Sequence, residues 1–182
     1  MKPIRIIDKV MLDELSEQAS TSARRRKNFN FHALESAPAN RLLNAIEPDS
    51  YVRPHRHLNA CKDETLFVLR GAVGLIVFDD TGGVLERRLL RAGSDAIGVD
   101  IAYATWHTFV GLETGSVIFE SKAGPYVPLS DQEKANWAPA GGSGRGDLSG
   151  TIARQVPCTS AGLATKCRAR QTAFKQIKVR AT

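Results

Sequence analysis

The chain has 182 residues, of which 42% are hydrophobic and 24% are charged. This length and composition suit one globular domain with a sizeable core, and they exclude a collagen, a coiled coil and a chain that is disordered throughout. No apolar run approaches the roughly 20 residues that a membrane-spanning helix needs. The N-terminal sequence MKPIRIIDKVMLDE carries charges where a signal peptide would be apolar, and three cysteines are too few for a disulfide framework. We therefore expect a protein of the reducing cytoplasm.

The net charge of +6 is concentrated at the C-terminal end of the chain. Residues 141–182 hold eight basic residues and one acidic residue, whereas residues 1–140 have a net charge of −1. A globular nucleic-acid-binding protein more often carries its basic patch on the folded part, so the charge does not favour a nucleic-acid partner. The same segment opens with Gly-Gly-Ser-Gly and has few large apolar residues, which predicts a flexible basic tail.

The pattern of apolar residues changes near residue 41, from helical spacing to short runs separated by turns. Residues 8–18 place apolar side chains among acids and amides at helical spacing, and Asp8 suits the start of a short helix. From residue 41 on, short apolar runs alternate with turn sequences such as the hairpin signal at residues 79–83. The strands that these runs predict are 41–47, 50–57, 64–70, 72–78, 84–91, 95–100, 107–112 and 116–122, and a helical turn is expected within 130–137.

Many short strands at this spacing predict an all-β fold, either an antiparallel sandwich or a barrel. The expected organisation is an N-terminal helix with an extended arm packed on the barrel at residues 1–40, the barrel itself at 41–140, and the tail at 141–182.

The placement of the four histidines is the most informative feature of the sequence. His55 and His57 are two residues apart on the predicted strand 50–57, so both side chains leave the same face. Tyr51 and Arg53 share that face. A row of tyrosine, arginine and two histidines is unusual for an apolar core and natural for the lining of a polar cavity.

A metal site can be built on this row. Glu64 opens the next predicted strand, and His107 begins another strand about fifty residues further on. Inside a barrel these two side chains can converge with His55 and His57 on one point. Three neutral imidazoles and one carboxylate suit one divalent transition metal, such as Fe, Mn, Zn, Ni or Cu, and leave coordination positions open for water or substrate.

These residues resemble the two cupin motifs. His55-x-His57 followed by Glu64 and Gly71 is similar to the first motif, and the loop that ends in His107 is similar to the second. The chain more closely resembles the WbuC family of cupin-fold metalloproteins, some of which are encoded in bacterial O-antigen clusters, in the segments Asn28–His32, Tyr51–His57, Thr105–Thr108, Glu120–Tyr126 and Trp137–Pro139. The resemblance covers residues 5–140 and implies a cupin double-stranded β-helix, a jelly-roll-like antiparallel barrel.

The chain departs from the cupin pattern in three ways. Six residues separate His57 from Glu64, which is more than the pattern has, so a salt-bridge role is the alternative to metal ligation for Glu64. Ala102 and Ala104 stand where the second motif has proline and glycine, so the turn before the third histidine lacks its usual glycine. Gly111 replaces the asparagine that closes the motif.

Further residues are candidates for proton transfer and substrate binding. The candidate acid/base groups are Tyr51, Glu64 and Tyr126, and the candidate substrate-binding groups are Asn30, His32, Arg53 and Lys122. Packing is the alternative role for His32, and a solvent-facing pair with Glu120 is the alternative for Lys122. The basic run at residues 24–27 is either a solvated stretch or, together with Arg53, an anion-binding patch at the mouth of the barrel.

The resemblance implies a small-molecule enzyme that uses its metal to act on a sugar or sugar nucleotide, which could be anionic, in surface polysaccharide (O-antigen) biosynthesis. Isomerase, epimerase and oxygenase chemistry remain open, and the alternative is a non-catalytic cupin that binds a small molecule or a metal as a sensor or storage module. Cupin barrels commonly pair through sheet edges, which implies a homodimer.

Overall fold

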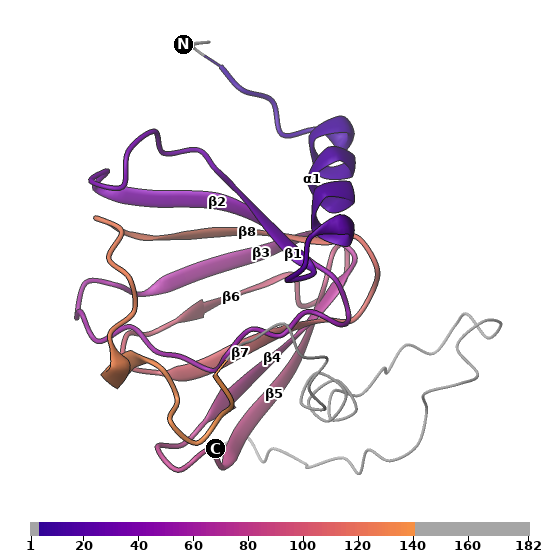
Figure 1. Ribbon diagram of the computed structural model, residues 1–182. Coiled ribbons are helices and arrows are strands. Elements are labelled where there is room, and N and C mark those ends of the chain that lie inside the picture. Colours follow the sequence, from indigo (N-terminus) through magenta and orange to yellow (C-terminus); the bar gives the residue numbers. More distant parts are fainter. Residues whose placement is uncertain (1–3, 141–182) are drawn as a thin grey trace, which may run out of the picture.

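The computed structural model describes residues 4–140 (Figure 1). They form helix α1 (Lys9–Thr21), strands β1 (Arg26–Asn30), β2 (Ala39–Ile46), β3 (Glu64–Arg70), β4 (Ala72–Phe78), β5 (Val84–Arg91), β6 (Gly98–Ile101), β7 (Trp106–Gly111) and β8 (Ser116–Ala123), and the 3₁₀ turn η1 (Asp131–Glu133). The predicted tail lies outside the described residues. None of the helices within residues 4–140 is long and apolar enough to cross a membrane.

Two antiparallel sheets face each other across the core (Figure 1). The larger sheet has the strand order β1-β2-β8-β3-β6, and the smaller has the order β5-β4-β7. The chain passes from one sheet to the other four times, between β3 and β4, between β5 and β6, between β6 and β7, and between β7 and β8. This arrangement is a jelly-roll-like antiparallel barrel, and it confirms the predicted all-β fold class.

The core between the sheets is built from the inward side chains of both. Apolar residues of the seven strands β2 to β8 meet there, namely Ile46, Leu66, Val68, Val73, Leu75, Leu90, Ile101, Phe109 and Ile118. Because side chains alternate along a strand, the neighbours of Ile46 and Ile118 point to the outer face of the larger sheet. That outer face is also apolar at Leu43, Ala45 and Val117, so it needs a cover.

Helix α1 supplies this cover. Its N-cap is Asp8, as predicted, whose carboxylate accepts a hydrogen bond from the Met11 N–H at 2.9 Å. Leu15 and Ala19 are the buried residues of the helix, and they pack on the outer apolar face of the sheet. Figure 1 shows the helix standing against this sheet, away from the smaller one.

The predicted strand at residues 50–57 is wrong. Pro54 lacks the N–H that a strand within a sheet would donate, and the segment runs as extended chain without a ladder. Its contact with the smaller sheet is an isolated bridge, in which the His55 N–H donates to the His107 carbonyl at 3.0 Å and the His107 N–H donates to the His55 carbonyl at 2.9 Å.

Strand β1 was missing from the sequence prediction. It pairs with β2 along its whole length, from Arg26 opposite Ile46 to Asn30 opposite Leu42. Much of the segment expected as an extended arm is therefore an edge strand of the larger sheet. Its polar composition concealed it, because an edge strand buries only a few of its side chains, here mainly Phe29.

Two departures from the cupin pattern have a structural explanation. Ala104 has a φ of 60°, in the left-handed region that favours glycine, so an alanine here takes the backbone conformation that the usual glycine would adopt at lower cost. At Gly111 an added Cβ would lie 2.7 Å from the carbonyl oxygen of Ile46, so the asparagine of the pattern has no room there.

We predict that Ala104→Gly raises the free energy of unfolding by up to about 1 kcal/mol, since a left-handed backbone costs an L-residue about 1–2 kcal/mol and the greater freedom of glycine in the unfolded chain offsets only part of this gain. Urea titration of the variant against the wild type measures the change. Ala102→Gly in the same loop is the control and should destabilise, because Ala102 has no positive φ to relieve. Destabilisation by both variants would contradict the explanation.

Candidate metal centre

Four side chains from distant parts of the chain meet inside the barrel. His55 and His57 come from the extended segment before β3, Glu64 is the first residue of β3, and His107 lies in β7. Each offers one ligand atom, and these atoms all lie within 4.8 Å of one another. This is the cluster that the sequence spacing predicted, and the longer gap before Glu64 does not carry that residue out of reach.

Backbone carbonyls orient two of the imidazole rings. The Nδ1 of His55 is 3.0 Å from the Arg53 carbonyl oxygen, and the Nδ1 of His107 is 2.9 Å from that of Thr105. A carbonyl can only accept, so both Nδ1 atoms carry the proton and both Nε2 atoms keep a free lone pair. Metal-binding histidines are commonly held in this way by the hydrogen bond of their other nitrogen.

The ionisation states of the cluster also suit a cation. Burial lowers the pKa of His55 to about 3, and burial likewise lowers the pKa of His107, so both rings are neutral at pH 7. Burial by itself would raise the pKa of Glu64, but the hydrogen bond with His57 and the charge of Lys122 outweigh it and hold the pKa below its ordinary value. Neutral imidazoles and an ionised carboxylate are the forms that bind a metal.

One orphaned atom marks where an ion fits. The Nε2 of His107 is buried and has no hydrogen-bond partner within residues 4–140, and it lies 3.8 Å from Glu64 Oε2. Buried polar atoms are nearly always paired, so such an atom needs an explanation. A divalent transition metal held by His55, His57, Glu64 and His107 would supply the missing partner, and this donor set is compatible with Fe, Mn, Zn and Ni.

Lys122 and Glu120 lie beside the cluster. The Lys122 Nζ is 3.4 Å from both Glu64 Oε2 and His57 Nε2, and 2.6 Å from Glu120 Oε1. Burial and the charge of Glu64 raise the pKa of Glu120. Burial would lower the pKa of Lys122, but the two glutamates outweigh it and raise that pKa, so the lysine is cationic. The solvent-facing alternative for this pair is therefore excluded.

The cluster borders a cavity of about 310 Å³. The residues that line it are Asn40, His55, His57, Asn59, Lys62, Lys122, Tyr126, Val127, Leu129 and Glu133. Four of the sequence-predicted site residues are among them: His55, His57, Lys122 and Tyr126. Sequence reasoning missed Asn40, Lys62 and Glu133, for which no motif was available because strand pairing and loop placement bring them together.

Glu64 and His107 belong to the cluster without lining the cavity, and the remaining four candidates lie elsewhere. The Tyr51 hydroxyl donates to the Pro139 carbonyl at 2.9 Å, and Arg53 Nε donates to the Ala135 carbonyl at 3.0 Å. His32 Nδ1 accepts from the Arg41 N–H at 3.2 Å, and Asn30 is exposed on β1. None of the four is among the cavity-lining residues. Their catalytic and substrate-binding roles stay predictions.

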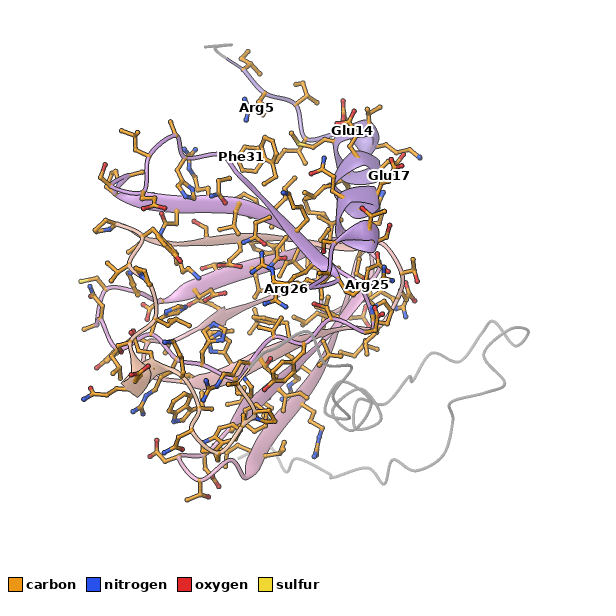
Figure 2. All side chains as sticks on the ribbon, viewed as in Figure 1. Arg5, Glu14, Glu17, Arg25, Arg26 and Phe31 are labelled. Carbon is orange, nitrogen blue, oxygen red and sulfur yellow. The ribbon has the colours of Figure 1, made fainter. Side chains whose placement is uncertain are left out.

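Two arginines of the basic run after α1 contact other parts of the described structure. Figure 2 shows Arg25 and Arg26 near the end of the helix. Arg25 Nε lies 2.9 Å from Asp49 Oδ1, and Arg26 Nη1 donates to the Tyr51 carbonyl at 2.6 Å. Burial lowers the pKa of Arg26. These two side chains thus connect the chain after the helix to residues 49–51, which lead into the segment with His55 and His57.

The chain matches one family model and is similar to several solved structures. A family model described as a domain of unknown function (DUF6016) matches residues 7–90. No curated protein matches the chain. Similar solved structures include KdgF from Halomonas sp., with 18% identity and a TM-score of 0.43 over 54% of this chain and 79% of that one.

Two further structures show the range of these similarities. Oxalate oxidase in complex with glycolate is 16% identical, with a TM-score of 0.46 over 59% of this chain and 55% of the oxidase, so the match spans about half of that protein. The conserved SPY1581 protein of unknown function from Streptococcus pyogenes is 8% identical, with a TM-score of 0.48 over 70% of this chain and 93% of that one. The chain itself has a jelly-roll-like antiparallel fold with a candidate metal centre of three histidines and one glutamate.

We predict that His55→Ala and His107→Ala each weaken metal binding by more than the roughly 10–100-fold lost when a hydrogen-bond partner of a metal ligand is removed, because each variant removes a ligand itself. Elemental analysis after metal loading and desalting measures the bound ion, and circular dichroism checks the fold. His32→Ala is the matched control, since His32 lies outside the cluster. Full metal content in both cluster variants would refute the assignment.

The metal-free protein should lose stability between pH 7 and pH 5. An unfolded histidine takes up a proton near pH 6.5, whereas folded His55 does so only near pH 3. The unfolded state therefore binds more protons in this window, and stability falls as the pH falls, by roughly 2 kcal/mol from this group. Urea unfolding in the presence of a chelator measures the slope, and His55→Gln should make it shallower. An equal slope in the variant would contradict the prediction.

Proposed function

We propose that this protein is a metal-dependent enzyme of surface polysaccharide biosynthesis, as its resemblance to the WbuC family implies, and that it acts on a sugar or a sugar nucleotide. The observation that carries the proposal is that His55 and His57 belong both to the metal cluster and to the lining of the cavity. An ion held by the cluster would thus face a ligand in the cavity.

A divalent ion bound here would polarise a carbonyl or hydroxyl oxygen of the ligand, or activate a water molecule. Two of the side chains around the ion, Glu133 and Lys122, stay charged, and a third, Tyr126, is the candidate for proton transfer. Burial would raise the pKa of Glu133, but the N–H groups of Leu58 and Ser130 outweigh it and lower that pKa to about 2, so Glu133 stays ionised. Lys122 is held cationic between two glutamates.

We assign the transfer of a proton to or from the ligand to Tyr126. It follows the end of β8, its backbone N–H donates to the Glu35 carbonyl at 2.7 Å, and its side chain is 50% exposed on the cavity wall. A tyrosine hydroxyl in this place can act as the acid or base of an isomerase or epimerase. Glu64 is the second candidate for the acid or base when no metal is bound, and it would be a metal ligand when the site is loaded.

The proposal includes a cytoplasmic location and a homodimer formed through sheet edges. In the described part of the chain, β1 and β6 are the edge strands of the larger sheet, and either could pair with a second copy.

We predict that the metal-loaded protein converts at least one member of a panel of nucleotide-activated sugars, that a chelator abolishes the conversion, and that Tyr126→Phe lowers kcat about 100-fold because the proton-transferring group is lost. Proton NMR of the reaction mixture detects the product. The matched control is Tyr103→Phe: Tyr103 is 47% exposed and does not line the cavity, so its variant should keep full activity.

Ligand-induced thermal stabilisation without turnover of any sugar would contradict the enzyme and favour the non-catalytic alternative. Equal loss of activity in the two tyrosine variants would contradict the proposed role of Tyr126 but not the proposal that the protein is an enzyme.

A further inference from the structure

One polar residue of the cavity has no role in the metal centre. Asn40 lies near the start of β2, is only 3% exposed and lines the cavity. Its Oδ1 atom is buried and has no hydrogen-bond partner among the described residues. Since a buried amide oxygen is costly to leave unpaired, its partner is to be sought in a molecule that occupies the cavity.

Strand pairing places Asn40 in one row with the metal centre. On the larger sheet Asn40 stands opposite Lys122, and Lys122 stands opposite Glu64. Side chains of directly paired residues leave the same face of a sheet and lie next to one another. A molecule that contacts an ion at Glu64 therefore has Lys122 and then Asn40 beside it.

The other amide and carboxylate acceptors of the lining are already engaged. Glu133 accepts from the backbone N–H groups of Leu58 and Ser130. The Oδ1 of Asn59 accepts from the Cys61 N–H at 2.9 Å. Among the amide oxygens of the described lining, the Oδ1 of Asn40 is the one without a partner, and an acceptor selects a ligand with an O–H or N–H group.

The rest of the cavity limits the size and shape of the ligand. The chain after β8 contributes Tyr126, Val127 and Leu129, an apolar wall that complements the polar row. The volume of about 310 Å³ is at the lower end of the roughly 300–1,000 Å³ of ligand pockets. A single sugar ring suits this space, because it carries hydroxyl groups on its rim and apolar C–H groups on its faces.

We infer that Asn40 is a specificity-determining residue whose Oδ1 accepts a hydrogen bond from one hydroxyl of a monosaccharide ring bound beside the metal centre. This inference rests on the proposed function and narrows it: the ring of the substrate enters the cavity, and any nucleotide attached to it lies outside.

The test measures calorimetric affinities of the full manganese-loaded chain for a panel of free hexoses and for the monodeoxy analogues of the best-bound hexose. The wild type should bind one monodeoxy analogue roughly tenfold more weakly than the parent sugar, because that analogue leaves Asn40 unpaired. Asn40→Leu should bind the parent sugar roughly tenfold more weakly and lose the discrimination. Asn40→Asp keeps the size and the acceptor and should keep the discrimination.

Asn44→Leu is the matched control. Asn44 lies on the same strand and the same face, and its Oδ1 is also buried and unpaired within the described residues, but it does not line the cavity. This variant should discriminate as the wild type does. Wild-type discrimination by Asn40→Leu would overturn the inference and leave the proposed function standing. If the wild type binds no hexose at millimolar concentration, the inference is overturned, whereas the proposed function is tested separately by the turnover of nucleotide-activated sugars.

Discussion

The backbone bridge between His55 and His107 is the constraint on which the candidate site depends. These residues are far apart in the sequence, and two hydrogen bonds of 3.0 and 2.9 Å join their main chains in antiparallel fashion. A directly opposed antiparallel pair sends its side chains to the same side, and the two imidazole rings accordingly lie with their centroids 4.6 Å apart. The bridge therefore sets the separation of two donor groups before any ion is present.

The loop before β7 reinforces this arrangement. The Ala104 N–H donates to the His57 carbonyl at 2.7 Å, so the turn that presents His107 also holds the second histidine of the extended segment. Ala104, which donates in this contact, is also the residue with the left-handed backbone. Local strain in one residue and the geometry of the cluster are thus linked, as is common at functional sites.

Charge balance explains how so many ionisable groups share the interior. Lys122 lies between Glu64 and Glu120, and its charge compensates part of theirs. Glu120 is flanked on the neighbouring strands by Leu42 and Leu66, both buried, so it depends on the lysine for compensation. Burying a charge is costly unless it is paired, and the row across the larger sheet provides the pairing next to a site that would itself add positive charge.

The sequence by itself determined the fold class, the capped helix at Asp8 and the four residues of the cluster, because apolar periodicity, turn residues and the spacing of His55, His57, Glu64 and His107 are local properties of the chain. It failed where the outcome depended on contacts. Residues 50–57 have the alternation of a strand, but Pro54 and the bridge to β7 leave them outside any ladder. For this reason Tyr51 and Arg53 do not share the cavity with the histidines.

Only the tertiary structure decided which polar residues surround the cluster. Asn40 and Lys122 are 82 positions apart and become neighbours because β2 pairs with β8. Register between strands depends on packing over the whole sheet, including the cover provided by α1, and no short motif records it. The ligand residues of the candidate metal centre can thus be recognised from short motifs in the sequence. The shape and specificity of the cavity, in contrast, arise from how the strands pair.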